Sequence, residues 1–251
     1  MMFSKEVAWV TGSSTGIGRA CALSLTKEGC KVAVHYNRSE DEAKEVVEEI
    51  ESTGGEALLV GGDVADAGEV KRMVGEIEER FGRLDILVNN AGSLIERRSL
   101  EEMDENLWDR VMDVNLKSVY LCSQAALPLM KRRGRGKIVN MTSVAARTGG
   151  GPGSVAYATS KGGVSTLTRA MAKELISDGI IVNAVAPGII TTPFHEQFTP
   201  DDVREKMTGN IPIGREGTPE EISAAVVYLA SSQADYIVGE ILEINGGMLM
   251  A

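Results

Sequence analysis

Cysteine and aromatic residues are scarce in this chain. Only 3 of its 251 residues are Cys, and aromatic residues make up 4%. Cys21, Cys30 and Cys122 lie far apart, and no two are separated by just two residues. This spacing excludes a disulfide framework and predicts no metal site. We expect all three to be buried thiols in a reducing cytoplasm.

Long apolar runs and basic runs are also missing. No stretch approaches the roughly 18 apolar residues of a membrane-spanning helix. Residues 1–5 lead into an apolar segment without a basic flank or cleavage site, so we expect no signal peptide. Lys and Arg number 26 against 36 Asp and Glu, a net charge of −10. Because a phosphate backbone is bound by clustered cations, nucleic acid is disfavoured as a partner. We therefore expect a cytoplasmic protein with no membrane or nucleic-acid partner.

The chain has the composition of an ordinary globular protein, with 43% hydrophobic and 25% charged residues. Its length allows two small domains or one large α/β domain. Short apolar segments alternate with amphipathic ones. The predicted strands are 7–10, 31–35, 57–60, 86–88, 138–140, 181–185 and 241–244. The predicted helices are 16–28, 39–50 with Ser39 as cap, 66 or 67 to 81, 108–130, 157–176 and 219–230.

These strands are short and almost continuously apolar, which indicates burial on both faces. Strand–helix alternation from end to end predicts an α/β fold of Rossmann type. We expect a doubly wound, parallel, seven-stranded sheet with helices on both faces, in a single domain over 1–251. The longest irregular stretch follows Pro187. It predicts a substrate lid around 188–218, with a short helix over 201–207.

A glycine-rich turn follows the first strand and opens the first helix. Such a turn lets the backbone approach a pyrophosphate, and the helix N-terminus offers it free N–H groups. The alternative is a glycine-rich turn without a ligand. Arg19 follows the last glycine, so this is not a Walker loop. The expected cofactor contacts here are Gly12, Ser14, Thr15, Gly16, Ile17 and Gly18.

The end of the second strand bears on the choice of cofactor. A carboxylate there would hold the ribose hydroxyls of NAD, but no acidic residue lies between the end of this strand and Glu40. Arg38, with Ser39, could pair with a 2′-phosphate instead. NADP(H) is therefore favoured and NAD(H) is possible, unless Arg38 and Ser39 only begin a helix. Asp63, after the third strand, either accepts from the adenine amino group or forms a turn.

Tyr157 and Lys161 are four residues apart on a predicted helix and so share one face. Ser143 follows the fifth strand, whose carboxyl end faces the same crevice. A phenol has a pKa of about 10, and a nearby ammonium group lowers it. Tyr157 could then exchange a proton with a carbonyl or alcohol oxygen that Ser143 also contacts. The alternative is that Tyr157 and Lys161 only take part in packing the helix against its neighbours.

These motifs in order resemble the short-chain dehydrogenase/reductase family, in its compact single-domain branch. They are Gly12-x3-Gly16-Ile17-Gly18, Asn89-Asn90-Ala91-Gly92, Ser143, Tyr157-x3-Lys161 and Pro187-Gly188. The resemblance implies a catalytic group of Ser143, Tyr157 and Lys161, with Asn115 as fourth member. It also implies further cofactor contacts at Val64, Asn89, Ala91, Gly92, Tyr157, Lys161, Pro187, Gly188, Ile190 and Thr192.

The resemblance implies hydride transfer at a small carbonyl or alcohol substrate and leaves the substrate open. The chain is similar to 3-oxoacyl-acyl-carrier-protein reductases, to sugar dehydrogenases and, over 147–151 and 192–195, to reductases of 2-keto uronates. Arg147 could bind a substrate carboxylate or be a solvated loop residue. His195 could contact substrate from the lid or be exposed. The rival class is a cofactor-sensing regulator without catalysis.

Two further features concern partners. Arg132, Arg133 and Arg135 form a cationic cluster that could dock an acyl carrier protein or complement a helix C-terminus. In the family that the chain resembles, the helices near 109–130 and 157–176 pack between subunits. The apolar tail, residues 248–250, would suit a second interface. We expect a homotetramer built on twofold axes.

Overall fold

Strands and helices alternate along the chain in the predicted order. The computed structural model describes residues 1–198 and 201–250. The strands are β1 Val7–Val10, β2 Lys31–Tyr36, β3 Ala57–Gly61, β4 Ile86–Asn89, β5 Gly136–Met141, β6 Ile180–Pro187 and β7 Ile241–Ile244. The α-helices are α1 Gly16–Lys27, α2 Glu40–Ser52, α3 Ala67–Phe81, α4 Glu105–Met112, α5 Ser118–Arg133, α6 Ala145–Thr148, α7 Val155–Leu175, α8 Pro193–Phe198, α9 Asp201–Gly209 and α10 Pro219–Ala230.

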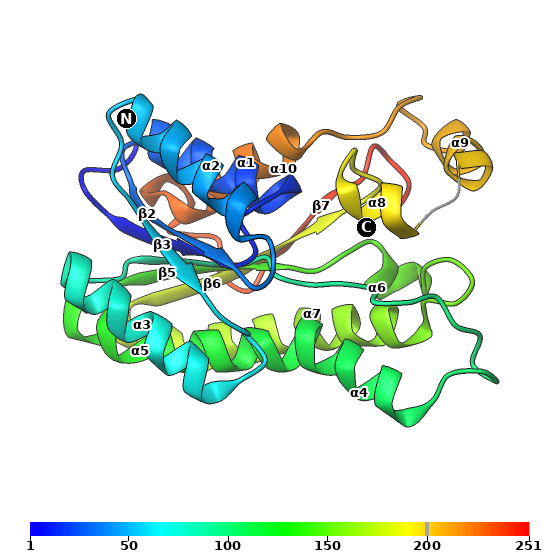
Figure 1. Ribbon diagram of the computed structural model, residues 1–251, viewed down its shortest axis with the longest axis horizontal. Helices are drawn as coiled ribbons and strands as arrows, with labels where there is room; N and C mark the ends of the chain where they lie inside the picture. Colours follow the sequence, from blue (N-terminus) through cyan, green and yellow to red (C-terminus); the bar gives the residue numbers. More distant parts are fainter. Residues whose placement is uncertain (199–200, 251) are drawn as a thin grey trace.

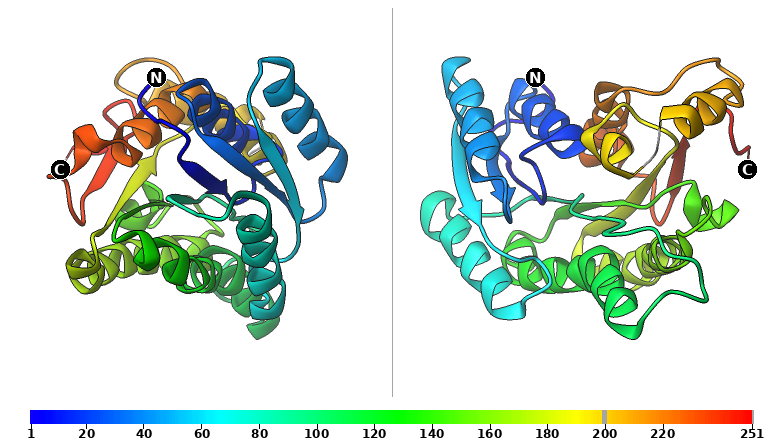
Figure 2. Two further views of the ribbon diagram at one scale, coloured as in Figure 1. Left: turned by 90° about the vertical axis from the view of Figure 1, so that its left-hand side faces the viewer. Right: turned by 45° about the vertical axis from the view of Figure 1, so that its right-hand side comes forward.

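Within these residues the strands form one seven-stranded parallel sheet in the order β3-β2-β1-β4-β5-β6-β7. Helices α1, α2 and α10 cover one face, and α3, α5 and α7 cover the other (Figures 1 and 2). The predicted Rossmann-type fold is confirmed. Strand order reverses between β1 and β4, and a ligand crevice forms at such a point, at the carboxyl ends of the strands.

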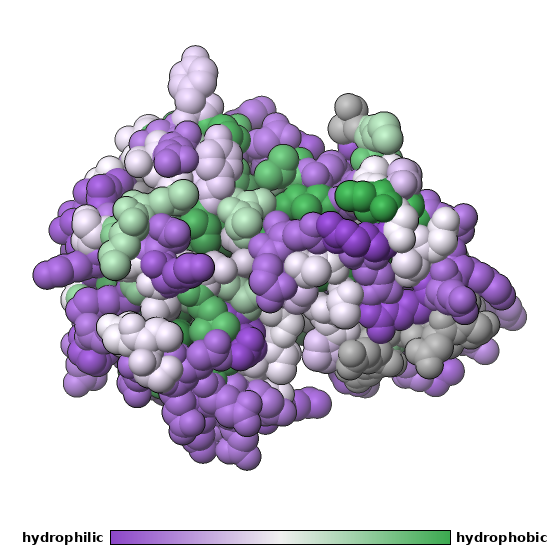
Figure 3. Space-filling model, turned by 90° about the horizontal axis from the view of Figure 1, so that it is seen from above, coloured by the Kyte–Doolittle hydropathy of each residue, from purple (hydrophilic) through white to green (hydrophobic). Residues whose placement is uncertain are grey.

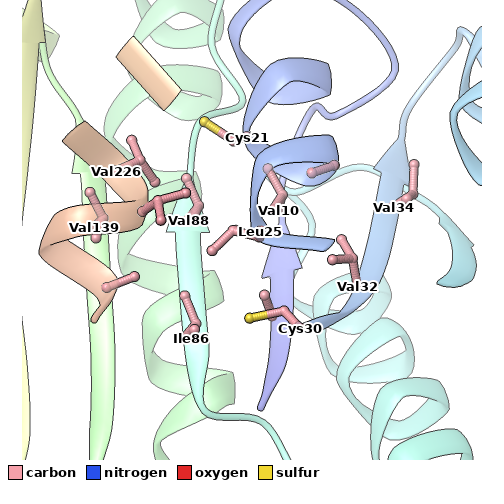
Figure 4. Packing of buried hydrophobic residues seen from close by; sticks show 14 of the residues in the cluster. Val10, Cys21, Leu25, Cys30, Val32, Val34, Ile86, Val88, Val139 and Val226 are labelled. Atoms are coloured by element: carbon pink, nitrogen blue, oxygen red, sulfur yellow. The ribbon is translucent and has the colours of Figure 1, made fainter. Parts of the chain in front are cut away.

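The sheet separates two hydrophobic cores. Ala8 and Val10 of β1 pack with α1 and α10, whereas Val7 and Trp9 belong to the core on the opposite face. Figure 4 shows the first core, where valines from neighbouring strands point toward α1 and α10. Each fully buried side chain of this size contributes about 1.5–3 kcal/mol. Burial on both faces explains why the strand sequences are almost continuously apolar.

The predicted helix over 108–130 is interrupted in the structure. Between α4 and α5 the chain forms one π-helical segment, Asp113–Lys117. Asn115, inside this segment, donates to the carbonyl oxygen of Val111 (2.8 Å) and to that of Ser93 on a neighbouring loop (2.6 Å). A side chain that bonds to a nearby helix carbonyl perturbs the regular ladder, and π-segments are frequent at functional sites.

The 188–218 segment holds two helices. The predicted helix over 201–207 is α9, and α8 was not predicted. In the part of the chain that the structure describes, no helix is long and apolar enough to cross a membrane. Seen from the side of α1 and α10, the surface is mostly hydrophilic, with hydrophobic residues in separate patches (Figure 3).

Candidate active site

One large cavity, of about 1080 Å³, lies at the carboxyl ends of the strands. Small-molecule and cofactor sites commonly measure about 300–1000 Å³. The cavity gathers most of the residues predicted from the sequence. Those that line it are Gly12, Ser14, Thr15, Gly16, Ile17, Gly18, Arg38, Ser39, Asp63, Val64, Ala91, Gly92, Ser143, Tyr157, Lys161, Pro187, Gly188, Ile190 and Thr192.

The turn after β1 needs its glycines. Gly12 has φ +61° and Gly16 has φ +54°, a region that favours glycine. At Gly18 a Cβ atom would lie 2.1 Å from the carbonyl oxygen of Gly12. Thr15, the N-cap of α1, makes no side-chain cap hydrogen bond. The first turn of α1 therefore presents backbone N–H groups to the cavity, as an anion site requires.

His35, at the end of β2, holds this turn in place. Its Nδ1 accepts from the amide of Gly12 (2.8 Å), so the ring proton is on Nε2, which donates to the carbonyl oxygen of Gly62 (3.0 Å). Burial lowers the pKa of His35 to about 4, which keeps the imidazole neutral. Sequence reasoning missed this role, although a histidine inside an apolar strand was a signal.

Asn90 is a second support that was missed. Its Nδ2 donates to the carbonyl oxygens of Thr11 and Gly12, both at 2.9 Å. Its neighbour Asn89 was predicted to contact the cofactor, and this is corrected. Asn89 is buried beneath the cavity, and its Nδ2 donates to Asn140 Oδ1 (2.8 Å) and Ser123 Oγ (3.1 Å). Asn89 joins the sheet to α5 instead.

At one end of the cavity lie Arg38, Ser39 and Asp63. Arg38 is exposed, and no carboxylate whose side chain the structure describes forms an ion pair with it. Ser39 precedes α2, and its hydroxyl makes no cap hydrogen bond. Asp63 Oδ1 accepts from the amide of Ala65 (2.8 Å), so this side chain does form a turn. Arg38 and Ser39 are left to face an anionic ligand.

At the other end of the cavity, Ser143, Tyr157 and Lys161 come together. Ser143 and Tyr157 both line this end, and Ser143 acts on the Tyr157 hydroxyl so as to lower its pKa. Lys161 Nζ lies 5.7 Å from the centroid of the Tyr157 ring and donates to the carbonyl oxygen of Met141 (2.8 Å). A phenol, a hydroxyl and an ammonium group at one point can donate a proton and hold an oxygen atom.

The pKa values at this end differ from the prediction. Burial raises the pKa of Tyr157 to about 12, while the Ser143 hydrogen bond and the positive charge of Arg97 act to lower it. Burial also lowers the pKa of Lys161 to about 8. The lowering of the Tyr157 pKa that we expected from Lys161 is therefore not produced by the protein alone, because removal from water dominates.

Asn115 lies behind the cavity wall rather than in it. Its Oδ1 accepts from the amide of Ser93 (3.1 Å). A Cβ atom at Gly92 would lie 2.7 Å from Asn115 Oδ1 and 3.3 Å from Lys161 Nζ. Only glycine at this position lets the two side chains approach each other. The π-helical segment thus brings Asn115 to the back of Lys161.

The structure tests the placement of one of the two candidate substrate residues, Arg147. Arg147 does not line the cavity and instead lies 3.6 Å from the carboxylate of Glu243, which favours the alternative of a loop arginine outside the site. His195 lies in α8, and its side chain is outside the described residues. A further cation that lines the cavity on the Tyr157 side is Arg97, which sequence reasoning missed. Two adjacent arginines in a polar loop carry no pattern that separates one from the other.

Aromatic rings complete this end. The Phe194 ring lies 5.8 Å from that of Tyr157, and the Phe198 ring lies 5.1 Å from that of Phe194. No group of three His, Cys, Asp or Glu side chains that could hold a metal occurs among the described residues. The chemistry available here is proton donation beside an apolar wall.

Comparison with known proteins agrees with this geometry. Residues 12–249 match the family model described as enoyl-(acyl carrier protein) reductase. The chain is 46% identical over 243 residues to the 3-oxoacyl-(acyl-carrier-protein) reductase FabG of Staphylococcus aureus, covering 97% of this chain and 98% of that protein. The chain belongs to the short-chain dehydrogenase/reductase family.

Two other members of the short-chain dehydrogenase/reductase family are similar over the whole chain. The 3-oxoacyl-(acyl-carrier-protein) reductase of Synechocystis sp. is 42% identical over 250 residues, covering 98% of this chain and 97% of that protein. A dehydrogenase/reductase from Sinorhizobium meliloti 1021, known as a crystal structure, superposes with a TM-score of 0.93 at 34% identity, covering 99% and 96%. The chain is thus an oxidoreductase of a family that uses a nicotinamide cofactor.

Proposed function

We propose that this enzyme is an NADP(H)-preferring carbonyl reductase acting on 3-oxoacyl thioesters of the acyl-carrier-protein type. One observation carries the proposal. Ser143, Tyr157 and Lys161 meet at one end of the cavity. At the other end Arg38 follows β2, and no acidic residue stands at the end of that strand. The names of the relatives at 46% and 42% identity support the thioester substrate.

The residues present fit a dinucleotide. The glycine turn and the open first turn of α1 suit a pyrophosphate, and a side chain at Gly12, Gly18 or Gly92 would intrude on this wall. Arg38 and the uncapped Ser39 hydroxyl would hold a 2′-phosphate. Lys161 would hold the ribose hydroxyls. The bound cofactor supplies a hydride to the substrate carbon.

Tyr157 would donate the proton that the carbonyl oxygen takes up. A pKa near 12 keeps its hydroxyl protonated at neutral pH, which is the form that reduction consumes. Ser143 would donate a hydrogen bond to the same oxygen, and Asn115, behind Lys161, would belong to the path that returns a proton. The balance is one carbonyl, one hydride and one proton giving one alcohol.

The test is oxidation of NADPH by the purified enzyme with acetoacetyl thioester. We expect turnover, and Tyr157→Phe should lower kcat by about 10²–10⁴ while NADPH binding is retained. Turnover of the Tyr157→Phe variant at the parent rate would contradict the assignment. Reduction of crotonyl thioester in place of acetoacetyl thioester would favour the enoyl activity named in the family description.

Cofactor preference has a separate test. Arg38→Ala should weaken NADPH binding by roughly ten- to hundredfold and leave NADH binding nearly unchanged, because a charge-assisted pair with the 2′-phosphate is lost. An unchanged ratio of the two affinities would show that Arg38 only begins α2. Sugar and keto-uronate substrates belong in the same panel.

Further proposals concern the surroundings of the site. The 188–218 segment, with Phe194 next to Tyr157, would serve as the lid over the substrate. A regulator without catalysis would have no use for Ser143, Tyr157 and Lys161 in one place, so we favour the enzyme. The three cysteines are free and buried, which fits a reducing cytoplasm. We also propose a homotetramer, and the Discussion gives its test.

A further inference from the structure

Arg97 lies on the loop between β4 and α4 and lines the cavity at the end where Tyr157 lies. Its Nε donates to the carbonyl oxygen of Phe198 (2.7 Å), and Nη1 donates to that of Pro152 (3.1 Å). A guanidinium group carries five N–H donors. Two are used to fix its position, which leaves three for a ligand in the cavity.

The charge of Arg97 is not balanced by the protein. Among the described residues no carboxylate forms an ion pair with it, whereas the adjacent Arg98 pairs with Glu96 at 2.5 Å. Arg97 is also partly removed from water, and this lowers its pKa. A partly desolvated cation without a counter-charge is unfavourable, and an anionic ligand would offset that cost.

The position of Arg97 limits which anion could bind. Arg97 is bonded to the backbone of Phe198, whose ring packs on Phe194 beside Tyr157, so a group bound to its free N–H donors lies on the Tyr157 side of the cavity. Phe194 and Phe198 form an apolar wall beside it. This combination suits a short carbon chain with a carboxylate close to the carbonyl, and the planar guanidinium matches a carboxylate with two parallel bonds.

We propose that Arg97 binds a substrate carboxylate beside the reacting carbonyl, so that the site also takes short 2- or 3-oxo carboxylic acids and favours them over their neutral esters. This rests on the proposed carbonyl reductase activity. The carbonyl carbon receives the hydride and its oxygen the proton of Tyr157, while the carboxylate is unchanged. The binding of a substrate carboxylate, which the sequence analysis considered for Arg147, is thus assigned to Arg97.

The experiment compares matched acids and esters at pH 7 with NADPH. The pairs are acetoacetate with methyl acetoacetate, and 2-oxobutanoate with methyl 2-oxobutanoate. The parent should prefer each acid. Arg97→Gln should lower kcat/KM for the acids at least about tenfold, mainly through KM, because charged hydrogen bonds are lost. For the esters it should change less than threefold, since Tyr157 is protonated at pH 7 in either protein.

Two further variants separate recognition from structure. Arg97→Lys keeps the charge but loses the planar donor pair, so its kcat/KM for the acids should lie between that of the parent and that of Arg97→Gln. Arg147→Gln removes an arginine that pairs with Glu243 outside the cavity, and it should leave all four values unchanged. Thermal unfolding and NADPH fluorescence show that each variant is folded and binds cofactor.

The remaining outcomes overturn the proposal. If Arg97→Gln lowers acids and esters by the same factor, Arg97 only holds α8 in place. If the parent prefers the esters, no carboxylate is recognised. If the enzyme reduces acetoacetyl thioester but Arg97→Gln leaves the acid-to-ester ratio of kcat/KM unchanged, this inference alone is contradicted. Failure to reduce thioester, acids and esters alike sinks the proposed function and this inference together.

Discussion

Two bases at the cavity, His35 and Lys161, both have pKa values lowered by burial. The consequences are opposite. His35 must stay neutral to accept the hydrogen bond from Gly12, whereas the role proposed for Lys161 requires a cation. The enzyme should therefore work best above the pH at which His35 becomes protonated and below the pH at which Lys161 loses its proton.

Stability should fall in acid because of His35. Its pKa is about 4 in the folded chain and about 6.5 when unfolded. Between these values the unfolded chain binds a proton that the folded chain refuses, so stability decreases as the pH falls from 6.5 to 4. The full effect is roughly 3 kcal/mol.

Urea unfolding at pH 7 and at pH 4.5 measures this. His35→Gln should lose most of the difference between the two pH values, whereas His195→Asn, which changes the other histidine of the chain, should keep it. Equal free energies of unfolding of the parent at the two pH values would contradict the prediction.

Activity should fall in base because of Lys161. Its pKa of about 8 means that the ammonium form is lost progressively above pH 8. We expect kcat/KM for thioester reduction to decline above that pH with the slope of one proton, since kcat/KM reports groups of the free enzyme. Lys161→Arg, if active, should lack this decline. A flat profile of the parent from pH 7 to 9.5 would refute the assignment.

Among the elements, α9 is held to the chain by a network around Glu216. Arg204 donates twice to its carboxylate (both 2.6 Å), and the hydroxyls of Thr191 (2.9 Å) and Thr208 (3.1 Å) donate to it as well. These bonds lower the pKa of Glu216 to about 2, so the network persists in mild acid. Thr191 adjoins Thr192 of the cavity wall.

Glu216→Gln should loosen this segment. The variant loses charged hydrogen bonds, each contributing roughly 1.5–3 kcal/mol. We expect hydrogen exchange across 201–209 to quicken at least tenfold and KM to rise several-fold, with little change in the unfolding temperature. Glu221→Gln is the matched control, because Glu221 pairs with the exposed Arg215 and glutamine can keep its capping bond to Thr218. The same quickening in both variants would speak against the network.

The sequence predicted best those helices whose ends carry local signals. Asp66 accepts from the amide of Glu69, and Gly82 ends α3 with φ +71°, so its bounds were found. Thr218 and Glu221 form a capping box at the start of α10, whose bounds, 219–230, were also predicted. Helix α6 has four residues and α8 six, too few for a periodic pattern. The π-segment at Asn115 depends on a bond to Ser93, a tertiary contact that local patterns do not contain.

The difference between local signals and tertiary contacts also explains which residues of the site were predicted. The turn glycines and the side chains of Ser143, Tyr157 and Lys161 line one cavity as predicted, because their spacing reports backbone shape and shared faces. Arg97, His35 and Asn90 were missed because each acts through partners distant in the sequence. The direction of the Tyr157 pKa was missed because burial depends on the complete fold.

For the molecule as a whole, two of the regions that carry exposed hydrophobic residues are candidate contacts between subunits. One is the β7 edge, with Leu242, Val238 and Met250; the other is Tyr120 on α5. An open edge strand with apolar residues invites pairing, and the helices near 109–130 were expected to lie between subunits. Two separate twofold contacts would give the tetramer that we propose.

Light scattering after size exclusion tests this. The parent should be a tetramer, Leu242→Asp and Tyr120→Asp should each be dimers, and the double variant should be a monomer, since a buried charge breaks each contact. Leu100→Asp alters a residue that is 72% exposed on the β4–α4 loop and should remain tetrameric. A monomeric parent would exclude the proposed assembly.

Tyr157 and Lys161 sit on the long helix α7, and Ser143 follows a central strand, whereas Arg97, Phe194 and Phe198 come from a loop and a six-residue helix at the rim. The residues proposed for hydride transfer and those proposed for substrate recognition thus lie in separate stretches of the sequence. Exchanging residues 94–104 and 193–198 between relatives should therefore transfer substrate selectivity and leave the proposed catalytic and cofactor-binding residues in place.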